Sequence, residues 1–146
     1  MRYEIDRDQR HFFEENGYIE FEEVAEKSLP QIVAELFKEP CLRLAFEWKI
    51  GTKNAFPVLE QSLRNFVSIS PIICAIIYTE ERVLVLAPNH RYPFHEIKNA
   101  KIIGYTTRKA VVKYHPNDPF TGELKNLGYA SGDRLKSETH PILYNE

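Results

Sequence analysis

The chain has 146 residues, of which 43% are hydrophobic and 27% are charged, a size and composition typical of one soluble globular domain. Its formal net charge of -2 provides no basic excess to neutralise a phosphate backbone, which disfavours a dedicated nucleic-acid binder and leaves open only a local basic patch. No stretch reaches the roughly 18–20 apolar residues that a membrane helix needs, and the charged N-terminus lacks the apolar segment of a signal peptide, so a cytoplasmic protein is expected.

The first residues predict a short helix with clear start and stop signals. Asp6 and Gln9 have the spacing of a capping box, and Gly17 is a typical residue just beyond a helix C-terminus. Between these signals, Phe12 and Phe13 are expected to face the core while the charged residues stay in water.

A strand, a helix and a longer strand are expected next. Residues 18–21 alternate in polarity, and residues 28–38 begin with a proline near the first helical position and repeat apolar side chains at helical spacing. Residues 42–50 have the cleanest period-two pattern in the chain, which places their apolar side chains in the core and Arg43 on the opposite face, toward solvent or a cavity. Residues 51–66 have no decisive period and are interpreted as a loop.

Residues 69–94 predict a buried hairpin around which the rest of the chain is organised. Residues 72–78 form a short apolar run rich in β-branched side chains, and residues 83–87 form a second run after a polar turn. Pro88 cannot donate to a strand ladder and ends the second strand. Beyond the hairpin, two short strands are expected at residues 101–105 and 109–114. A series of turns is expected at residues 115–122, and the tail ends in an apolar run at residues 142–144.

No internal repeat, low-complexity tract or linker divides the chain, so a single domain over residues 1–146 is predicted. Its helical N-terminal part with the first strand occupies residues 1–40, and a β body occupies residues 41–146. Two helices followed by many short strands predict an α+β, mainly β protein, with a sheet-on-sheet or jelly-roll body and the N-terminal helices packed outside. Cys41 and Cys74 lack the spacing of a zinc site and are expected to be buried, reduced thiols.

Histidines are the first candidates for a metal site. His90 and His95 lie in a segment loosely similar to the metal-binding half of a cupin, but extended chain places them on opposite faces unless a turn at Pro93 intervenes. His115 and Asp118 could present two ligands from one turn, although an Asx turn with a surface histidine is the commoner arrangement.

Three short motifs occur in order along the chain. They are Phe13-Glu-Glu-Asn-Gly17-Tyr18, the strand ending in Pro88-Asn-His90-Arg91, and Gly122-Glu-Leu124 followed by Tyr129-Ala-Ser131-Gly132-Asp133-Arg134. Together they resemble motifs of the phytanoyl-CoA dioxygenase-like family of Fe(II)/2-oxoglutarate oxygenases. The resemblance implies a double-stranded β-helix (jelly roll, cupin-like) with the hairpin at its centre, and a catalytic iron held by two histidines and one carboxylate.

The iron-ligand positions of that family carry other residues in this chain. The resemblance maps the His-x-Asp motif to Glu60 and Ser62 and the distal histidine to Tyr129, which implies a vestigial pocket where these three side chains converge at one end of the barrel. Because hydroxyl and phenol groups are poor Fe(II) ligands, no cofactor is expected. The basic residue that binds 2-oxoglutarate in the family maps near Arg134 and Lys136, so these two are candidates for anion binding.

Two functional interpretations follow. The favoured one is a non-catalytic, degenerate oxygenase-like domain that binds an unknown small molecule or protein, with no membrane partner. The alternative is an active dioxygenase with Fe(II) and 2-oxoglutarate, in which His90, His95 or His115 supplies the metal ligands in a different register. A third, a DNA-associated regulator, is supported only by scattered basic residues.

Overall fold

The computed structural model describes residues 4–54, 56–57, 60, 63, 68–79, 81–93, 96–118 and 120–146. Its helices and strands, in chain order, are α1 (Arg7–Asn16), β1 (Tyr18–Glu22), the 3-10 helix η1 (Glu26–Ser28), α2 (Leu29–Phe37), β2 (Cys41–Lys49), β3 (Ile69–Tyr78), β4 (Arg82–Leu86), β5 (Lys101–Val112), α4 (Phe120–Asn126) and β6 (Ile142–Asn145).

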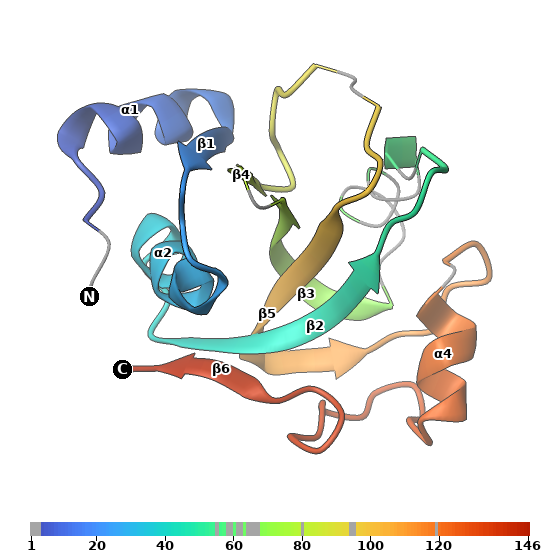
Figure 1. The fold of residues 1–146 in the computed structure, drawn as a ribbon. Helices are drawn as coiled ribbons and strands as arrows, with labels where there is room; N and C mark the ends of the chain where they lie inside the picture. Colours follow the sequence, from blue (N-terminus) through green and yellow to red (C-terminus); the bar gives the residue numbers. More distant parts are fainter. Residues whose placement is uncertain are drawn as a thin grey trace.

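The described strands form one antiparallel, strongly curled sheet in the order β1-β4-β3-β5-β2-β6 (Figure 1). The prediction of an α+β, mainly β protein is therefore confirmed. A jelly roll has two facing sheets, whereas these strands lie in a single sheet, so that finer topology is not confirmed. Within the described residues, every helix is too short or too polar to cross a bilayer.

The sheet is covered on both faces, which explains the continuous apolar runs of the hairpin. Along β3, Cys74 and Ile76 pack into a core with α1 and α2, whereas Ala75 and Ile77 pack into a second core on the other face. The second core is covered by Leu124 of α4, by Tyr129 and Leu135 after it, and by Phe56, Leu63 and Ile97 from the segments between β2 and β3 and between β4 and β5. A half-buried strand would alternate in polarity, but these side chains are buried on both sides and are apolar throughout.

The expected helix signals are present at both ends of α1. The Asp6 carboxylate accepts the backbone N–H of Gln9, whose side chain accepts the N–H of Asp6, and Gly17 adopts a left-handed φ of 73°. Phe13 is buried against α2, as predicted, but Phe12 is 42% exposed. The prediction for Phe12 was wrong because adjacent helix positions point about 100° apart and only one face of α1 contacts α2.

Three predicted segments differ from the structure. Residues 101–114 were expected to form two strands, but β5 is continuous to Val112 because β3 pairs with it on both sides of the polar residues at 107–109, at Thr106 and again at Val111 and Val112. Residues 56–57, 60 and 63 have helical backbone within the expected loop. The turn signal at Thr121-Gly122 lies inside α4, which is held to the core by the buried side chain of Leu124.

Both cysteines are free and buried, as predicted. Burial raises the pKa of the Cys74 thiol, which keeps it protonated and unreactive.

Candidate functional site

Two of the three motifs meet where α1 ends. The backbone N–H of Ala87 donates to the carbonyl of Gly17 at 2.8 Å, and the N–H of Arg91 donates to the carbonyl of Asn16 at 2.8 Å. A Cβ on Gly17 would lie 2.7 Å from the Cα of His90, closer than such atoms approach. Glycine is therefore required here both for its positive φ and for the close approach of the two backbones.

This contact buries His90, whose ring nitrogens are both hydrogen-bonded. Nδ1 accepts the backbone N–H of Tyr92 at 3.1 Å, so the ring proton of the neutral imidazole lies on Nε2. Nε2 then donates to Oε1 of Glu60 at 2.5 Å. The His90 side chain is fully buried, while the Glu60 side chain is 25% exposed. The buried His90 and the partly exposed Glu60 thus form a structural pair, which the sequence pattern did not indicate.

Tyr129 lies at another place, under the loop that follows α4. Its hydroxyl accepts the N–H of Lys136 at 2.8 Å and contacts Oγ1 of Thr139 at 2.5 Å and Nδ1 of His140 at 2.9 Å. One donor and two acceptor positions exhaust what a phenol offers. Burial, with a smaller contribution from the positive charge of Arg43, lowers the pKa of His140 and favours its neutral form.

Arg43 lies below the same loop, whereas its face of the strand was expected to point to solvent or a cavity. Its side chain is buried because the loop covers it: Nη1 donates to the carbonyl of His140 at 2.8 Å and contacts Oγ of Ser137 at 3.4 Å. Its Nε has no partner within the described part of the chain. Sequence periodicity alone does not indicate that a distant loop will cover the polar face of a strand.

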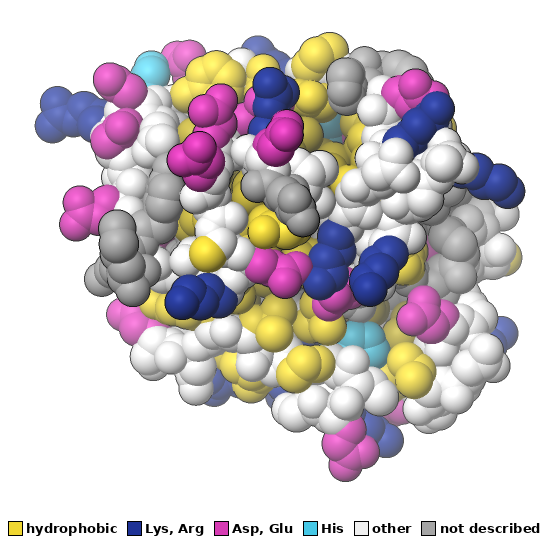
Figure 2. Space-filling model, viewed as in Figure 1, with side chains coloured by type: hydrophobic (Ala, Val, Ile, Leu, Met, Phe, Trp, Pro, Cys, Tyr) yellow, Lys and Arg dark blue, Asp and Glu magenta, His cyan; other side chains and the backbone are white. Residues whose placement is uncertain are grey.

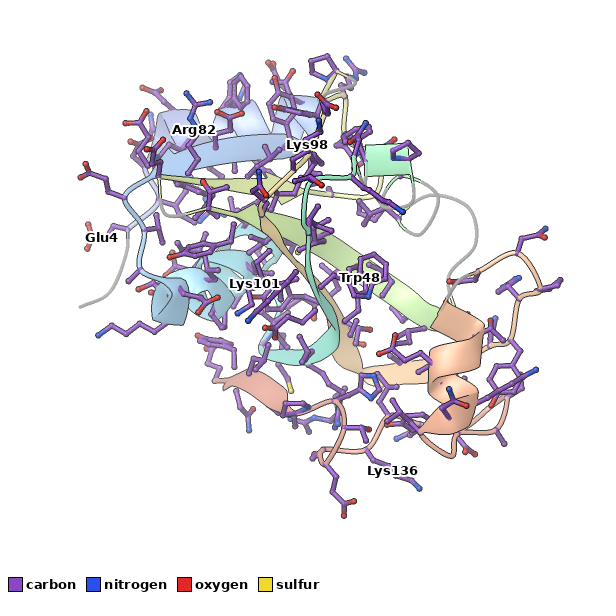
Figure 3. All side chains as sticks on the ribbon, turned by 45° about the vertical axis from the view of Figure 1, so that its right-hand side comes forward. Glu4, Trp48, Arg82, Lys98, Lys101 and Lys136 are labelled. Atoms are coloured by element: carbon purple, nitrogen blue, oxygen red, sulfur yellow. The ribbon has the colours of Figure 1, made fainter. Side chains whose placement is uncertain are left out.

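The two anion-binding candidates are exposed on this loop. Nζ of Lys136 lies 5.9 Å from the centroid of the Tyr129 ring, and Arg134 forms an isolated bridge with Val111. Figure 3 shows Lys136 at the opposite end of the molecule from Arg82 and Lys98.

Among the described positions, His90, His115 and Tyr129 lie in separate hydrogen-bonded groups. Ser62 and His95 lie outside the described residues, so the position of Ser62 stays a prediction, whereas Glu60 and Tyr129 lie in separate hydrogen-bonded groups. His115 is half-buried in a turn whose backbone bonds to Thr121. Across the described positions, no group of three or more His, Cys, Asp or Glu side chains is arranged to hold a metal ion.

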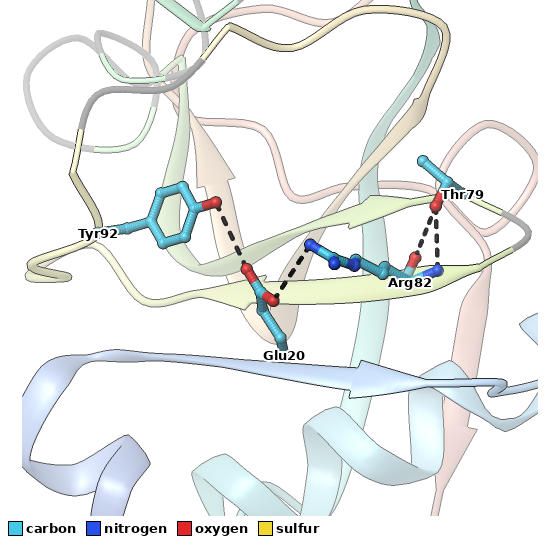
Figure 4. Close-up of polar contacts among 4 residues, drawn as sticks. All are labelled: Glu20, Thr79, Arg82 and Tyr92. Atoms are coloured by element: carbon cyan, nitrogen blue, oxygen red, sulfur yellow. Dashed lines mark hydrogen bonds and ion pairs between the residues drawn. The ribbon is translucent and has the colours of Figure 1, made fainter.

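A different polar cluster lies where β1 and β4 meet the segment after β4 (Figure 4). The hydroxyl of Tyr92 donates to Oε1 of Glu20 at 3.4 Å, and Nη1 of Arg82 lies 3.8 Å from Oε2 of the same carboxylate. Thr79 fixes the backbone of Arg82 through its hydroxyl. Burial and the negative charge of Glu20 raise the pKa of Tyr92, so the phenol stays protonated and remains a donor.

These side chains border a pocket of about 180 Å³ with an apolar floor and a charged rim. Its floor contains Ile77, Leu84, Ile97 and Ala100, and its rim adds Glu96 and Lys98, which are paired at 2.9 Å.

A second, wider groove of about 530 Å³ adjoins this pocket and shares Glu20 and Tyr92 with it. Phe12 and Tyr18 line it, with ring centroids 5.3 Å apart at 87°, and Tyr18 and Tyr92 are 5.0 Å apart at 79°. We call this the aromatic groove; its walls are Asp8, Gln9, Phe12, Tyr18, Ile19, Glu20, Tyr92 and Pro93.

The sequence analysis missed the aromatic groove because its residues come from three separate segments. One signal was available: Tyr18 and Glu20 occupy alternate positions of a five-residue strand and therefore share its outward face. No protein-family model matches the chain, and no curated protein and no solved structure shows significant similarity to it.

Proposed function

We propose that this chain is a non-catalytic binding domain, a degenerate relative of the Fe(II)/2-oxoglutarate oxygenases that binds a small ligand or a partner protein. One observation supports it above the others: the polar atoms of His90 and Tyr129 are already used in hydrogen bonds within the chain. A side chain that serves as a metal ligand needs a free lone pair directed at the metal.

Metal binding by His90 would disrupt the fold around it. Coordination through Nδ1 would displace the N–H of Tyr92, and coordination through Nε2 would require loss of its proton and of the contact with Glu60. Because His90 is only 2% exposed, the displaced groups would not readily find water instead. The pair is better suited to hold the corner after β4 than to bind a metal ion.

The binding surface that we propose is the aromatic groove with the adjoining pocket. Both open to solvent, and both combine apolar walls with a few fixed polar groups, which is the usual composition of a ligand site. The Glu20 carboxylate lies between them and is oriented by Tyr92 and Arg82 (Figure 4).

The jelly-roll relationship is part of this proposal. The resemblance rests on three motifs, and the contact between Gly17 and the backbone at His90 supports it, because two of those motifs require each other. The curl of the antiparallel sheet is compatible with the same relationship.

The experiment is an anaerobic titration with Fe(II) and 2-oxoglutarate, followed by exposure to oxygen and measurement of bound iron and succinate. We expect neither stoichiometric iron nor succinate. Iron binding with turnover would refute the proposal and favour the alternative, an active dioxygenase; loss of both in His90→Gln or His115→Gln would then identify the ligand. If 2-oxoglutarate binds without iron, and Lys136→Ala abolishes this binding, the anion site lies on the loop that follows α4.

A further inference from the structure

We propose that the aromatic groove receives a lysine or arginine side chain of a basic partner protein. This inference rests on the proposed function, because it names the partner of the same binding surface.

Three aromatic rings line the groove, and because Tyr18 packs edge to face against Phe12 and Tyr92, a cation would bind over their outward faces and not between them. Tyr18 stands nearly perpendicular to both Phe12 and Tyr92, so the groove is bordered by ring faces as well as ring edges. Aromatic faces carry negative electrostatic potential and attract ammonium and guanidinium groups within about 6 Å of the ring centroid. Phe12 is 42% exposed, so a ligand can reach its ring without a conformational change.

Two carboxylates complete the site. Asp8 and Glu20 line the same groove, one from α1 and the other from β1. Arg82 forms an ion pair with Glu20, but its Nη1 lies 3.8 Å from the carboxylate oxygen and its side chain is 67% exposed. Such an exposed pair is weak, so an incoming cation can share Glu20 with Arg82.

The acidic character extends well beyond the groove, which favours a protein partner over a free amine. Residues 1–30 contain nine acidic and four basic residues, a net charge of -5, whereas the remaining residues contain twelve acidic and fifteen basic ones. Acidic side chains gather over α1 and β1 (Figure 2). A basic protein surface would contact this whole region, while a small amine would contact only the groove.

The experiment titrates the isotope-labelled 146-residue chain with a short peptide of alternating lysine and serine, monitored by amide chemical shifts. The fully acetylated peptide is the charge control, and N-acetyl-lysine amide tests a free amine. We expect the lysine peptide to shift residues of the aromatic groove, and the acetylated peptide and the free amine to bind far more weakly.

Variants distinguish the groove from general acidic attraction. Phe12→Leu keeps an apolar side chain and removes the ring, and Glu20→Gln keeps the shape and removes the charge; each should raise the Kd roughly tenfold. Leu127→Ser and Glu123→Gln change exposed residues at and after α4, and they should leave the Kd unchanged. Unchanged thermal midpoints will show that all four variants are folded.

Equal affinity in wild type and Phe12→Leu, equal binding of the acetylated peptide, or no peptide binding would overturn this inference. Tighter binding of the free amine than of the peptide would overturn the assignment to a protein partner. These outcomes are separate from failure of the proposed function, which is detected by iron-dependent succinate formation and not by the peptide titration.

Discussion

The contact between Gly17 and the corner at His90 leads to a sharp prediction about stability. In Gly17→Ala, the new Cβ would lie 2.7 Å from the Cα of His90 and 3.1 Å from its backbone nitrogen. Both neighbours are backbone atoms, so no side-chain rotation can relieve the clash. The alanine would also have to keep a φ of 73°, which L residues adopt at a cost.

The expected loss is the sum of these two effects. A non-glycine residue in the left-handed region costs about 1–2 kcal/mol, and forcing an extra methyl group into a packed site typically costs a further 1–3 kcal/mol, so Gly17→Ala should lose about 2–5 kcal/mol. Gly128 is the matched control because its φ is 91° and a Cβ there would meet nothing within 4 Å. Gly128→Ala should therefore lose only the conformational part, about 1–2 kcal/mol.

Urea denaturation of wild type and both variants measures the free energies of unfolding. If Gly17→Ala costs no more than Gly128→Ala, the two backbones do not approach as described, and the structural role of the two motifs would be refuted. The chemical shifts of His90 and its neighbours should also change in Gly17→Ala and stay constant in Gly128→Ala.

Three further predictions concern the interior. Gly104→Ala should force the Phe46 ring away from β5. Because the ring centroid of Trp48, the only tryptophan, lies 4.9 Å from that of Phe46, the tryptophan fluorescence should change. An unaltered emission spectrum would contradict this packing. Arg43→Met removes a buried cation whose Nε lacks a partner in the described structure, and it should change the free energy of unfolding by about 1 kcal/mol or less. Arg43→Ala leaves a cavity and should lower the free energy of unfolding by about 2–4 kcal/mol. Urea denaturation measures both changes. Because the pKa of His140 in the folded chain lies below its ordinary value of 6.5, the unfolded chain binds that proton more tightly. Stability should therefore fall as the pH drops below 6.5, and His140→Gln should make thermal midpoints measured across this range less pH-dependent than those of wild type.

Much of the fold could be predicted because its signals are local. The capping box of α1, the glycine that ends it and the strands of the hairpin depend on a few adjacent residues, and all are present. The continuity of β5 and the burial of Arg43 depend on segments distant in sequence, which periodicity does not report. α4 was missed because Gly122 is a turn signal that the packing of Leu124 overrides.

The candidate site was less predictable than the fold. The resemblance directed attention to Glu60, Ser62 and Tyr129, and the structure shows the first and last of these in separate hydrogen-bonded groups. The aromatic groove depends on Phe12 being exposed, which is the opposite of what its apolar character indicates. A surface aromatic residue cannot be distinguished from a core one until the partner of its helix is known.

The strand order also has a consequence for how the chain assembles. The three central strands, β4, β3 and β5, come from the continuous segment 69–112, whereas β1 and β6 add at the two edges from opposite ends of the chain. Pairing of β2 with β6 joins residues about a hundred positions apart, and closing so long a loop is entropically costly before its contacts form. We therefore expect β3, with β4 and β5 paired on either side of it, to form the folding nucleus, with low φ-values in β6 and in the loop over Arg43. The loop that follows α4 would then be the last part of the protein to become ordered.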